Sequence, residues 1–275
     1  MKQSERAQKL KGESGFNKYY EALYGERWAS LRDALHGEPD YAEYRLDSAL
    51  EPYYLDSGSI RCAVSFPLNG AKRILDLCAA PGGKTLVLAS CMDTDAELLS
   101  NERSVDRYNR LVNVCDSCLP ESIRKRVHVS CKDGARLCQN PDNQFDRILL
   151  DAPCSSERHV LTDSRYLNEW SPSRIRTLAV AQWALLSSAW RMLMPGGYLL
   201  YSTCALCLEE NDEIIARLIK KFEGAKIVEP VVANDITPFC SAKLPGCEKT
   251  EYGMHVLPDK QGGAGPLYFS LIQKC

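Results

Sequence analysis

The chain contains no long apolar run, and none of its hydrophobic stretches approaches the roughly 18 residues that a membrane-spanning helix requires. The amino-terminal stretch MKQSERAQKLKGESG lacks the hydrophobic core of a secretory signal, and its glutamates are unlike a typical transit peptide. Internal repeats and low-complexity tracts are absent too, which excludes repeat architectures. We therefore expect a soluble cytoplasmic protein that does not enter a membrane.

The chain also lacks an excess of positive charge. Its formal net charge of −2 argues against binding nucleic acid through a bulk positive field. Local basic clusters remain, at Arg124, Lys125 and Arg126, and at Arg158, His159, Arg165, Arg174 and Arg176. Glu157, Asp163 and Glu169 dilute the second cluster, so its sequence alone is typical of a solvated surface.

The thirteen cysteines are an odd number, and without a secretory signal we expect free thiols rather than a disulfide framework. Two pairs have zinc-like spacing, Cys115 with Cys118 and Cys204 with Cys207. The first pair lies in a helical pattern about 90 residues before the second, with no histidine nearby to complete a site. We therefore predict no metal.

The order of apolar patterns indicates the fold class. From residue 72 onward, short apolar runs such as RILDL and FDRILLD alternate with helical stretches, which is the pattern of a doubly wound parallel sheet. A length of 275 residues suits one large core. Before this region, GFNKYYEALYGERWASLRDAL has apolar residues at helical spacing, which predicts one amphipathic helix or two short ones. We expect a helical extension over residues 1–60 and one α/β domain over residues 61–275.

The stretch ILDLCAAPGGKT, residues 74–85, joins a predicted strand to a predicted helix. Its GGKT ending is similar to a phosphate-binding P-loop, but Cys78 stands where that loop needs its first glycine. A plain turn without a ligand is a further alternative. The crevice beyond the carboxyl end of the first strand is where open parallel sheets bind cofactors, so the loop is a candidate cofactor site.

Acidic residues follow the next two predicted strands. Glu102 lies about 20 residues past the loop, where dinucleotide-type folds place an acid on the ribose hydroxyls. Asp133, followed by Gly134, ends the third strand, where its carboxylate could accept an adenine amino group. Each could instead be an ordinary turn or helix cap. Together they outline a nucleoside pocket.

Two cysteines follow the fourth and fifth predicted strands. LLDAPCSS places Asp151 and Cys154 at one strand end, and LLYSTCAL places Thr203 and Cys204 at the next. Because adjacent parallel strands end at the same edge, we expect both thiols and the carboxylate in one pocket. The alternative is that these are ordinary buried cysteines.

These stretches, together with SNERSVDR, CKDGA and PGGYLLYS, resemble the Sun (Fmu) family of RNA cytosine-5 methyltransferases, which use S-adenosylmethionine on a Rossmann-like sheet. The resemblance runs from about residue 16 to the end of the chain, and its most specific part is the pair of PC and TC strand ends. It implies a mostly parallel seven-stranded sheet whose last strand is antiparallel. The YGERW and GPLYF stretches are most similar to the branch that acts on small-subunit ribosomal RNA.

The resemblance also implies roles for single residues. Cys204 matches the nucleophile and Cys154 the cysteine that helps to release the product, while Asp151 would border both cofactor and base. The residues implied to bind S-adenosylmethionine are Cys78, Ala79, Ala80, Pro81, Gly82, Gly83, Lys84, Glu102, Arg107, Asp133, Gly134 and Asp151. Glu102 departs from the family's usual aspartate, and residues 103–105 replace its usual Ser-Pro stretch.

The chemistry of such a site explains the thiol. Carbon 5 of cytosine is a poor nucleophile, so Cys204 adds first to carbon 6, and a carboxyl group such as Asp151 stabilises the charge on the ring. The expected substrate is a single-stranded or flipped cytosine in RNA, with ribosomal RNA favoured and transfer RNA the nearest alternative. A P-loop NTPase and an RNA-binding scaffold without turnover are the other hypotheses.

Overall fold

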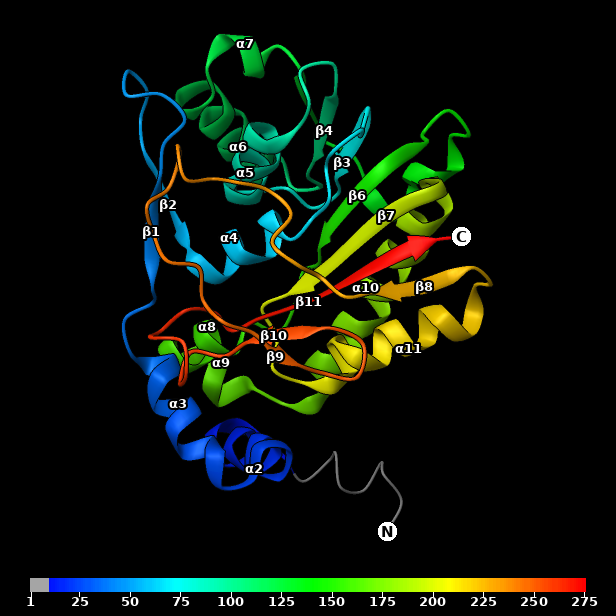
Figure 1. The fold of residues 1–275 in the computed structure, drawn as a ribbon. Helices are drawn as coiled ribbons and strands as arrows, with labels where there is room; N and C mark the ends of the chain where they lie inside the picture. Colours follow the sequence, from blue (N-terminus) through cyan, green and yellow to red (C-terminus); the bar gives the residue numbers. More distant parts are fainter. Residues whose placement is uncertain (1–9) are drawn as a thin grey trace.

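The computed structural model describes residues 10–275. Within them, a central sheet carries helices on both faces, and the amino-terminal helices pack below it (Figure 1). The helices are α2 (Gly12–Tyr24), η1 (Gly25–Arg27), α3 (Trp28–His36), α4 (Ser57–Val64), α5 (Gly83–Cys91), α6 (Val105–Cys118), α7 (Glu121–Arg124), η2 (Gly134–Gln139), α8 (Glu157–Thr162), α9 (Ser164–Glu169), α10 (Pro172–Met192), η3 (Leu208–Glu210) and α11 (Asp212–Lys221). The strands are β1 (Tyr41–Tyr44), β2 (Tyr53–Asp56), β3 (Arg73–Asp76), β4 (Glu97–Asn101), β5 (Val127–Ser130), β6 (Phe145–Asp151), β7 (Leu193–Thr203), β8 (Ala225–Val228), β9 (Glu248–Lys249), β10 (Met254–Val256) and β11 (Leu267–Lys274).

The main sheet has nine strands in the order β5-β4-β3-β6-β7-β11-β10-β9, with β8 also paired to β11. The five strands from β5 to β7 are parallel, and β11 runs antiparallel to β7. This arrangement confirms the predicted fold class and its antiparallel last strand. Two short strands, β9 and β10, extend the sheet beyond the seven strands that the resemblance implied.

Alternate residues of the parallel strands pack into two separate hydrophobic cores, one on each face of the sheet. Ile74 packs on one face of the sheet with apolar residues of α4, α5 and α6, while its neighbour Leu75 packs on the other face with α10 and α11. This alternation follows from the two-residue period of a strand. Both faces of the sheet are therefore covered, which explains why its strands read as continuous apolar runs.

The amino-terminal helices form a third core with the segment that follows β6. α2 and α3, separated by η1, match the prediction of two short helices. Phe16 packs edge-on against Trp170 with ring centroids 5.2 Å apart, and Tyr20 stacks on Trp28 at 5.1 Å. Residues 1–9 of the expected extension lie outside the described residues, and α4 crosses its expected boundary at residue 60.

Several short elements were not predicted from the sequence, namely the β1–β2 hairpin, α8, α9 and β8. The hairpin contacts α5 and leads directly into α4, whose amino terminus is capped by the side chain of Asp56. Among residues 10–275, no helix combines the length and the apolar composition needed to cross a membrane.

Candidate active site

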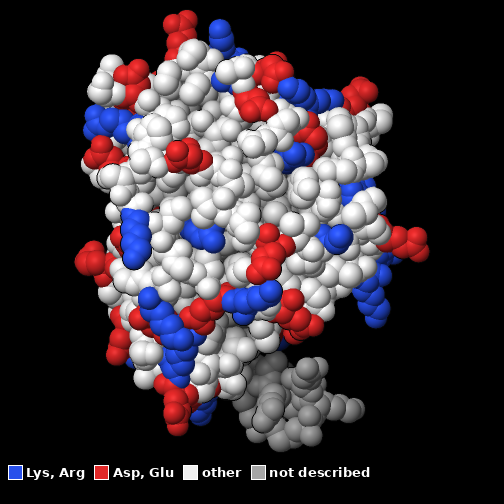
Figure 2. All heavy atoms as spheres, in the orientation of Figure 1, with Lys and Arg blue, Asp and Glu red and all other residues white. Residues whose placement is uncertain are grey.

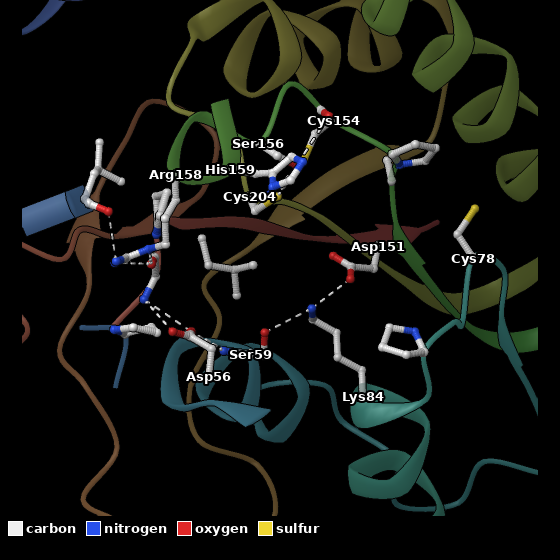
Figure 3. A pocket seen from close by; sticks show the side chains of 18 of the residues that line it. Asp56, Ser59, Cys78, Lys84, Asp151, Cys154, Ser156, Arg158, His159 and Cys204 are labelled. Carbon is white, nitrogen blue, oxygen red and sulfur yellow. Dashed lines mark hydrogen bonds and ion pairs between the residues drawn. The ribbon is translucent and has the colours of Figure 1, made fainter. Parts of the chain in front are cut away.

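A cavity of about 760 Å³ opens at the carboxyl edge of β3, β6 and β7. Its wall includes the loop after β3, the cysteines that follow β6 and β7, and side chains of α4 and α8 (Figure 3). A second cavity of about 540 Å³ lies beside it, between the ends of β3, β4 and β5 and the helix α10. Cys78, Arg107 and Pro153 line both cavities, so the two are adjacent.

The two predicted catalytic cysteines face each other in the larger cavity. Cys154 Sγ lies 2.7 Å from Cys204 Sγ, and the backbone N–H of Cys204 donates to Cys154 Sγ at 3.3 Å. Ser156 Oγ lies 3.1 Å from Cys204 Sγ. The hydrogen bond to Cys204, followed by burial, raises the pKa of the Cys154 thiol well above its usual value. Cys154 is therefore held as a neutral thiol beside Cys204.

An ion pair lies across the same cavity. Lys84 Nζ donates to Asp151 Oδ2 at 2.8 Å and to Ser59 Oγ at 3.2 Å, while Ser202 Oγ donates to Asp151 Oδ1 at 2.8 Å. Burial disfavours the charged form of Lys84, but the negative charge of Asp151 outweighs it and raises the lysine pKa. Asp151 thus has a permanently charged partner in a partly enclosed pocket.

The smaller cavity holds the predicted nucleoside-binding acids. Glu102 Oε1 accepts the backbone N–H groups of Arg103 and Ser104 at 2.8 and 2.9 Å. Its buried Oε2 accepts no hydrogen bond within the described chain and lies 3.5 Å from Nη1 of Arg107. Asp133 and Gly134 line the same cavity, and Asp133 caps η2. A buried carboxylate oxygen that accepts no hydrogen bond beside such a cavity suits a ligand hydroxyl, so these residues fit the ribose of S-adenosylmethionine.

The loop after β3 contributes most of its residues to these cavities. A third cavity of about 320 Å³ adjoins them and shares Cys78 and Ala80 with the largest of the three. The loop residues that line one or more of the three cavities are Cys78, Ala79, Ala80, Pro81, Gly83 and Lys84. Gly82 instead faces α6, with φ at +121°, and a Cβ there would lie 2.9 Å from Val114 Cγ1. Gly82 therefore serves to form the turn. Only glycine adopts this positive φ freely, and α6 leaves no room for a Cβ at this position. Arg107 Nη2 donates to the carbonyl of Ala80 at 2.5 Å and so supports the loop from α6.

The same loop argues against the triphosphate hypothesis. In a P-loop the lysine reaches phosphates and the following hydroxyl binds Mg²⁺. Here Lys84 is directed to Asp151, and the buried Thr85 hydroxyl donates to Asp76 Oδ2 at 2.7 Å. Neither side chain is positioned for nucleoside triphosphate chemistry.

The structure adds site residues that the sequence did not reveal. Asp76, Asp56, Ser59 and Tyr41 line the cavities, and Arg158 ties the loop after Cys154 to distant backbone. Its guanidinium donates to carbonyls of residues 34, 35, 37, 263 and 265. In the sequence, only the position of Asp76 at the end of a predicted strand could have indicated a role in the site. In the structure, its buried Oδ1 has no hydrogen-bond partner in the described residues.

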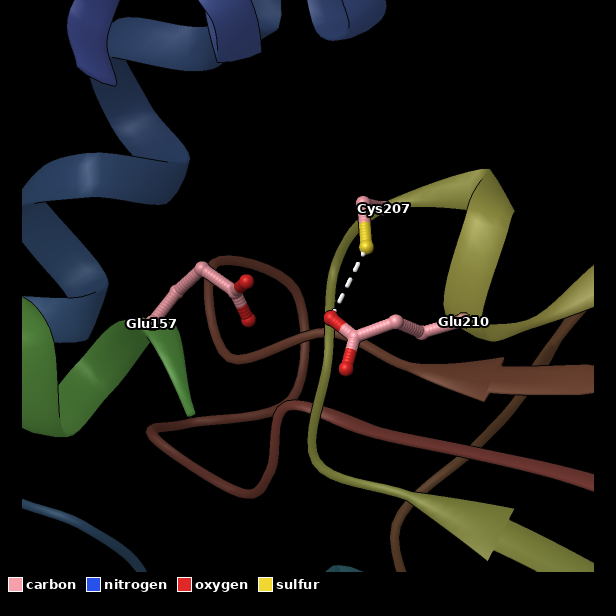
Figure 4. A group of neighbouring side chains, drawn as sticks. All are labelled: Glu157, Cys207 and Glu210. Atoms are coloured by element: carbon pink, nitrogen blue, oxygen red, sulfur yellow. Dashed lines mark hydrogen bonds between the residues drawn. The ribbon is translucent and has the colours of Figure 1, made fainter. Parts of the chain in front are cut away.

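Glu157 and Glu210 form a buried carboxylate pair next to Cys207 (Figure 4). Ser155 Oγ contacts both Glu157 Oε1 and Glu210 Oε2, so it joins the loop of Cys154 to the loop of Cys204. Cys207 Sγ donates to Glu210 Oε2 at 3.0 Å, and Tyr20 Oη donates to Glu157 Oε1 at 2.5 Å. Glu157, Cys207 and Glu210 carry ligand types for a metal, but their atoms are already hydrogen-bonded as they stand.

The zinc-like cysteine pairs lie apart from each other. Cys115 and Cys118 are buried in the packing of α6, whereas Cys207 belongs to the carboxylate pair and Cys204 to the cavity. All thirteen cysteines are free thiols.

Comparison with known proteins decides the family. A family model described as 16S rRNA methyltransferase RsmB/F matches residues 64–271. The chain belongs to the RsmB/F family. Ribosomal RNA small subunit methyltransferase F of Serratia proteamaculans is 34% identical over 223 residues, which cover 78% of this chain and 45% of that protein. The mitochondrial tRNA (cytosine(34)-C(5))-methyltransferase of Danio rerio is 31% identical over 231 residues, covering 82% of this chain and 61% of that protein.

A solved structure supports the same family. NSun6 from Pyrococcus horikoshii, solved with SFG, has a TM-score of 0.65 and 25% identity, covering 81% of this chain and 53% of that one. The resemblance to the Sun family is thus confirmed for this RsmB/F member. The chain spans about half the length of the relatives it matches, at 45% and 61% of the two curated proteins.

Proposed function

We propose that the chain is an RNA methyltransferase that transfers a methyl group from S-adenosylmethionine to carbon 5 of a cytosine. The observation that carries this proposal is the meeting of Cys204, Cys154 and the Lys84–Asp151 pair in one cavity, next to a second cavity lined by Glu102 and Asp133. Family membership and relatives named for cytosine-5 methylation of RNA support the same reaction. The division into a helical extension, residues 1–60, and a methyltransferase domain, residues 61–275, is part of the proposal.

The cavity of about 540 Å³ and the neighbouring one of about 320 Å³ would hold the cofactor along the carboxyl edge of the sheet. Glu102 would bind the ribose hydroxyls, Asp133 and Gly134 would border the adenine, and the loop of residues 78–84 would hold the methionine end. The unpartnered Oδ1 of Asp76 suits the ammonium group at that end. When bound, S-adenosylmethionine supplies an electrophilic methyl group on a sulfonium centre. A relative solved with the cofactor analogue SFG supports this assignment.

The chain's own groups prepare the base. Cys204, as the thiolate, forms a bond to carbon 6 of cytosine, and the ring electrons move toward carbon 5 and nitrogen 3. Asp151, held by Lys84 and Ser202, can hydrogen-bond the nitrogen 3 and amino edge, where charge accumulates. After methylation, carbon 5 gives its proton to a bound water, and the electron pair of that C–H bond re-forms the double bond to carbon 6 as the bond between carbon 6 and Cys204 breaks.

Release of the product would use Cys154. Its S–H lies beside the sulfur that departs, and its raised pKa keeps a proton available at that place. Cys154 can therefore donate to the Cys204 thiolate as that group leaves the ring.

Ribosomal RNA is the favoured substrate, because the family model and the first relative are named for small-subunit ribosomal RNA. Transfer RNA is the second candidate, since a relative at 31% identity is named for a tRNA cytosine.

The test is methyl transfer from radiolabelled cofactor to purified small-subunit ribosomal RNA and to total transfer RNA, followed by mapping of 5-methylcytosine. Cys204→Ala should abolish transfer while it preserves cofactor affinity in calorimetry. Cys154→Ala should accumulate a covalent protein–RNA adduct, visible as a slowly migrating band on a denaturing gel. Full activity of Cys204→Ala would overturn the mechanism, and Cys115→Ala serves as the matched control for loss of a thiol outside the cavity.

A further inference from the structure

A cluster of basic side chains surrounds one tyrosine at the rim of the larger cavity. The guanidinium carbon of Arg165 lies 4.9 Å from the centroid of the Tyr166 ring, and that of Arg174 lies 5.6 Å from it. The imidazole of His159 is 5.0 Å from the same ring, centroid to centroid. We call these four residues the rim cluster. Because a ring face attracts cations, Tyr166 holds two guanidinium groups together that would otherwise repel each other.

The rim cluster is continuous with the cavity of the cysteines. His159 belongs to α8, and together with Thr162 it lines that cavity (Figure 3). The cluster is therefore reached from Cys154 by following the chain through α8 and then crossing to Tyr166 on α9. A strand of RNA whose target base enters the cavity would pass over this rim.

Folding removes one of the three acids that diluted this cluster in the sequence and engages a second, while Glu169 stays exposed. Glu157 points inward and is fully buried, so its charge does not reach the surface. Asp163 accepts the backbone N–H of Arg165 at 2.9 Å as the cap of α9, and its carboxylate is 3.7 Å from the Arg165 guanidinium. Arg174 has no carboxylate within 4.0 Å in residues 10–275. The surface is more basic than its sequence suggests.

Arg174 places a positive charge at the amino terminus of α10, where a helix disfavours it. It is the third residue of α10, and the first turn of that helix contains no acidic side chain. Cations are unfavourable at a helix amino terminus, where the backbone dipole is positive. A residue that breaks a local rule without a compensating partner is a candidate for function.

The surface drawn in Figure 2 carries charges of both signs, and its basic and acidic side chains are interspersed. With a net charge of −2, the chain cannot hold an RNA strand by its overall charge. A local group of cations next to the cavity is what a single-stranded substrate would need.

We propose that the rim cluster binds the backbone phosphates of single-stranded RNA next to the target cytosine, with Arg165 and Arg174 as the phosphate ligands and Tyr166 as their positioning residue. This inference rests on the proposed function and names the part of the surface that carries the substrate. The planar guanidinium fork suits phosphate oxygens, because it can donate two parallel hydrogen bonds. His159 would lie between the flanking phosphate and the base in the cavity.

The test measures binding of a fluorescein-labelled, cytosine-containing single-stranded RNA by anisotropy, with S-adenosylhomocysteine present, over about 50 to 200 mM salt. Arg165→Gln/Arg174→Gln should lower the slope of log affinity against log salt by about 1.4, since each lost phosphate contact removes about 0.7. At about 0.1 M salt this corresponds to a loss on the order of 25-fold. In turnover, KM for RNA should rise while kcat at saturating RNA is retained, because these residues do not touch the reacting atoms.

Arg73→Gln/Arg191→Gln is the matched control. Arg73 begins β3 and Arg191 lies in the last turn of α10, so both are exposed at the opposite edge of the sheet. This variant should keep the wild-type slope. Tyr166→Leu, which keeps both charges, should lower affinity while it leaves the slope nearly unchanged, and unaltered cofactor affinity would show that each variant is folded.

The outcomes separate this inference from the proposed function. Suppose that the wild-type protein binds and methylates RNA, and that Arg165→Gln/Arg174→Gln keeps the wild-type affinity and slope. This result would overturn the role of the rim cluster but not the proposed function. An equal loss in the control variant would do the same, because it would show a diffuse effect of charge. Absence of RNA binding and methyl transfer in the wild-type protein would overturn the proposed function itself.

Discussion

Asp151 ends β6, and the Glu157–Glu210 pair lies in the segments that follow β6 and β7, but the protein balances their charges differently. Asp151 faces the cavity with about a third of its side chain exposed, and it is paired with the ammonium of Lys84. Glu157 is fully buried, and neither it nor Glu210 has a lysine or arginine within 4.0 Å in residues 10–275. One acid is balanced by a cation and the other two by neutral donors.

A count of protons explains how the buried pair is stable. Ser155 Oγ has one proton but contacts a carboxyl oxygen of both Glu157 and Glu210, so it can donate to only one of them. The other close contact requires a proton on a carboxyl group. Burial, and then the charge of Glu210, raise the pKa of Glu157 to about 7, which makes Glu157 the holder of that proton.

The difference teaches what each arrangement is suited to do. A charged carboxylate next to a cavity can respond to charge that develops on a bound base. A buried pair that shares one proton and does not line the cavity cannot, but it connects the loop of Cys154 to the loop of Cys204 and, through Tyr20, to α2. We infer that the first acts in the reaction and the second positions the two thiols.

The largest effect should come from Asp151→Asn. This change keeps the shape of the side chain but removes the charge that balances Lys84 and faces the base, so kcat should fall by about 100- to 10,000-fold. Steady-state methyl transfer at saturating RNA would measure it. Asp116→Asn, at an exposed acid of α6, is the control and should retain wild-type kcat. A kcat for Asp151→Asn close to wild type would remove Asp151 from the chemistry.

Next comes the contrast between Glu157→Ala and Glu157→Gln. Alanine leaves the Tyr20 hydroxyl and the N–H of Leu206 without their buried partner, and each such group costs about 1–3 kcal/mol, so the free energy of unfolding should fall by about 2 kcal/mol or more. Glutamine resembles the protonated acid and should stay within about 1 kcal/mol of wild type. Urea unfolding would compare them, and equal losses in both variants would contradict the neutral carboxyl.

The pH dependence of stability gives a smaller effect. Because the folded pKa of Glu157 is raised from 4.5 to about 7, its proton stabilises the folded state fully below the unfolded value. That contribution is lost as the pH rises through about 7. Between about pH 5 and pH 8, Tm should therefore decline more steeply for wild type than for Glu157→Gln. Parallel Tm curves for the two proteins would show that Glu157 does not carry the proton.

The smallest expected effect concerns the link to α2. Tyr20→Phe removes the hydrogen bond to Glu157 and should lower the free energy of unfolding by about 1 kcal/mol, with a modest fall in kcat. Tyr19→Phe is the matched control, since its hydroxyl donates to Glu209 in a half-buried position outside the pair. We expect a smaller loss of stability and unchanged kcat there. If the two variants lose the same stability and the same kcat, the hydrogen bond from α2 does not help to position the cysteines.

Much of the fold could be predicted because its signals are local. RILDL and FDRILLD are buried on both faces, so they read as continuous apolar strands, and both became strands of the parallel sheet. The helices α2 and α3 followed from apolar spacing. The hairpin β1–β2 and the strands β8, β9 and β10 could not be predicted, because they are short and are defined by pairing with distant partners rather than by their own composition.

The sequence by itself determined the order of strands and helices and the placement of Asp151, Cys154 and Cys204 at strand ends, since parallel strands deliver their carboxyl ends to one edge. Only the tertiary structure decided where single side chains point. Gly82 faces α6 rather than the cavities, and Glu157 turns inward to Tyr20, which lies 137 positions away in the chain. The physical reason is that burial and hydrogen-bond partners come from whichever residues the fold brings together, and no local pattern encodes them.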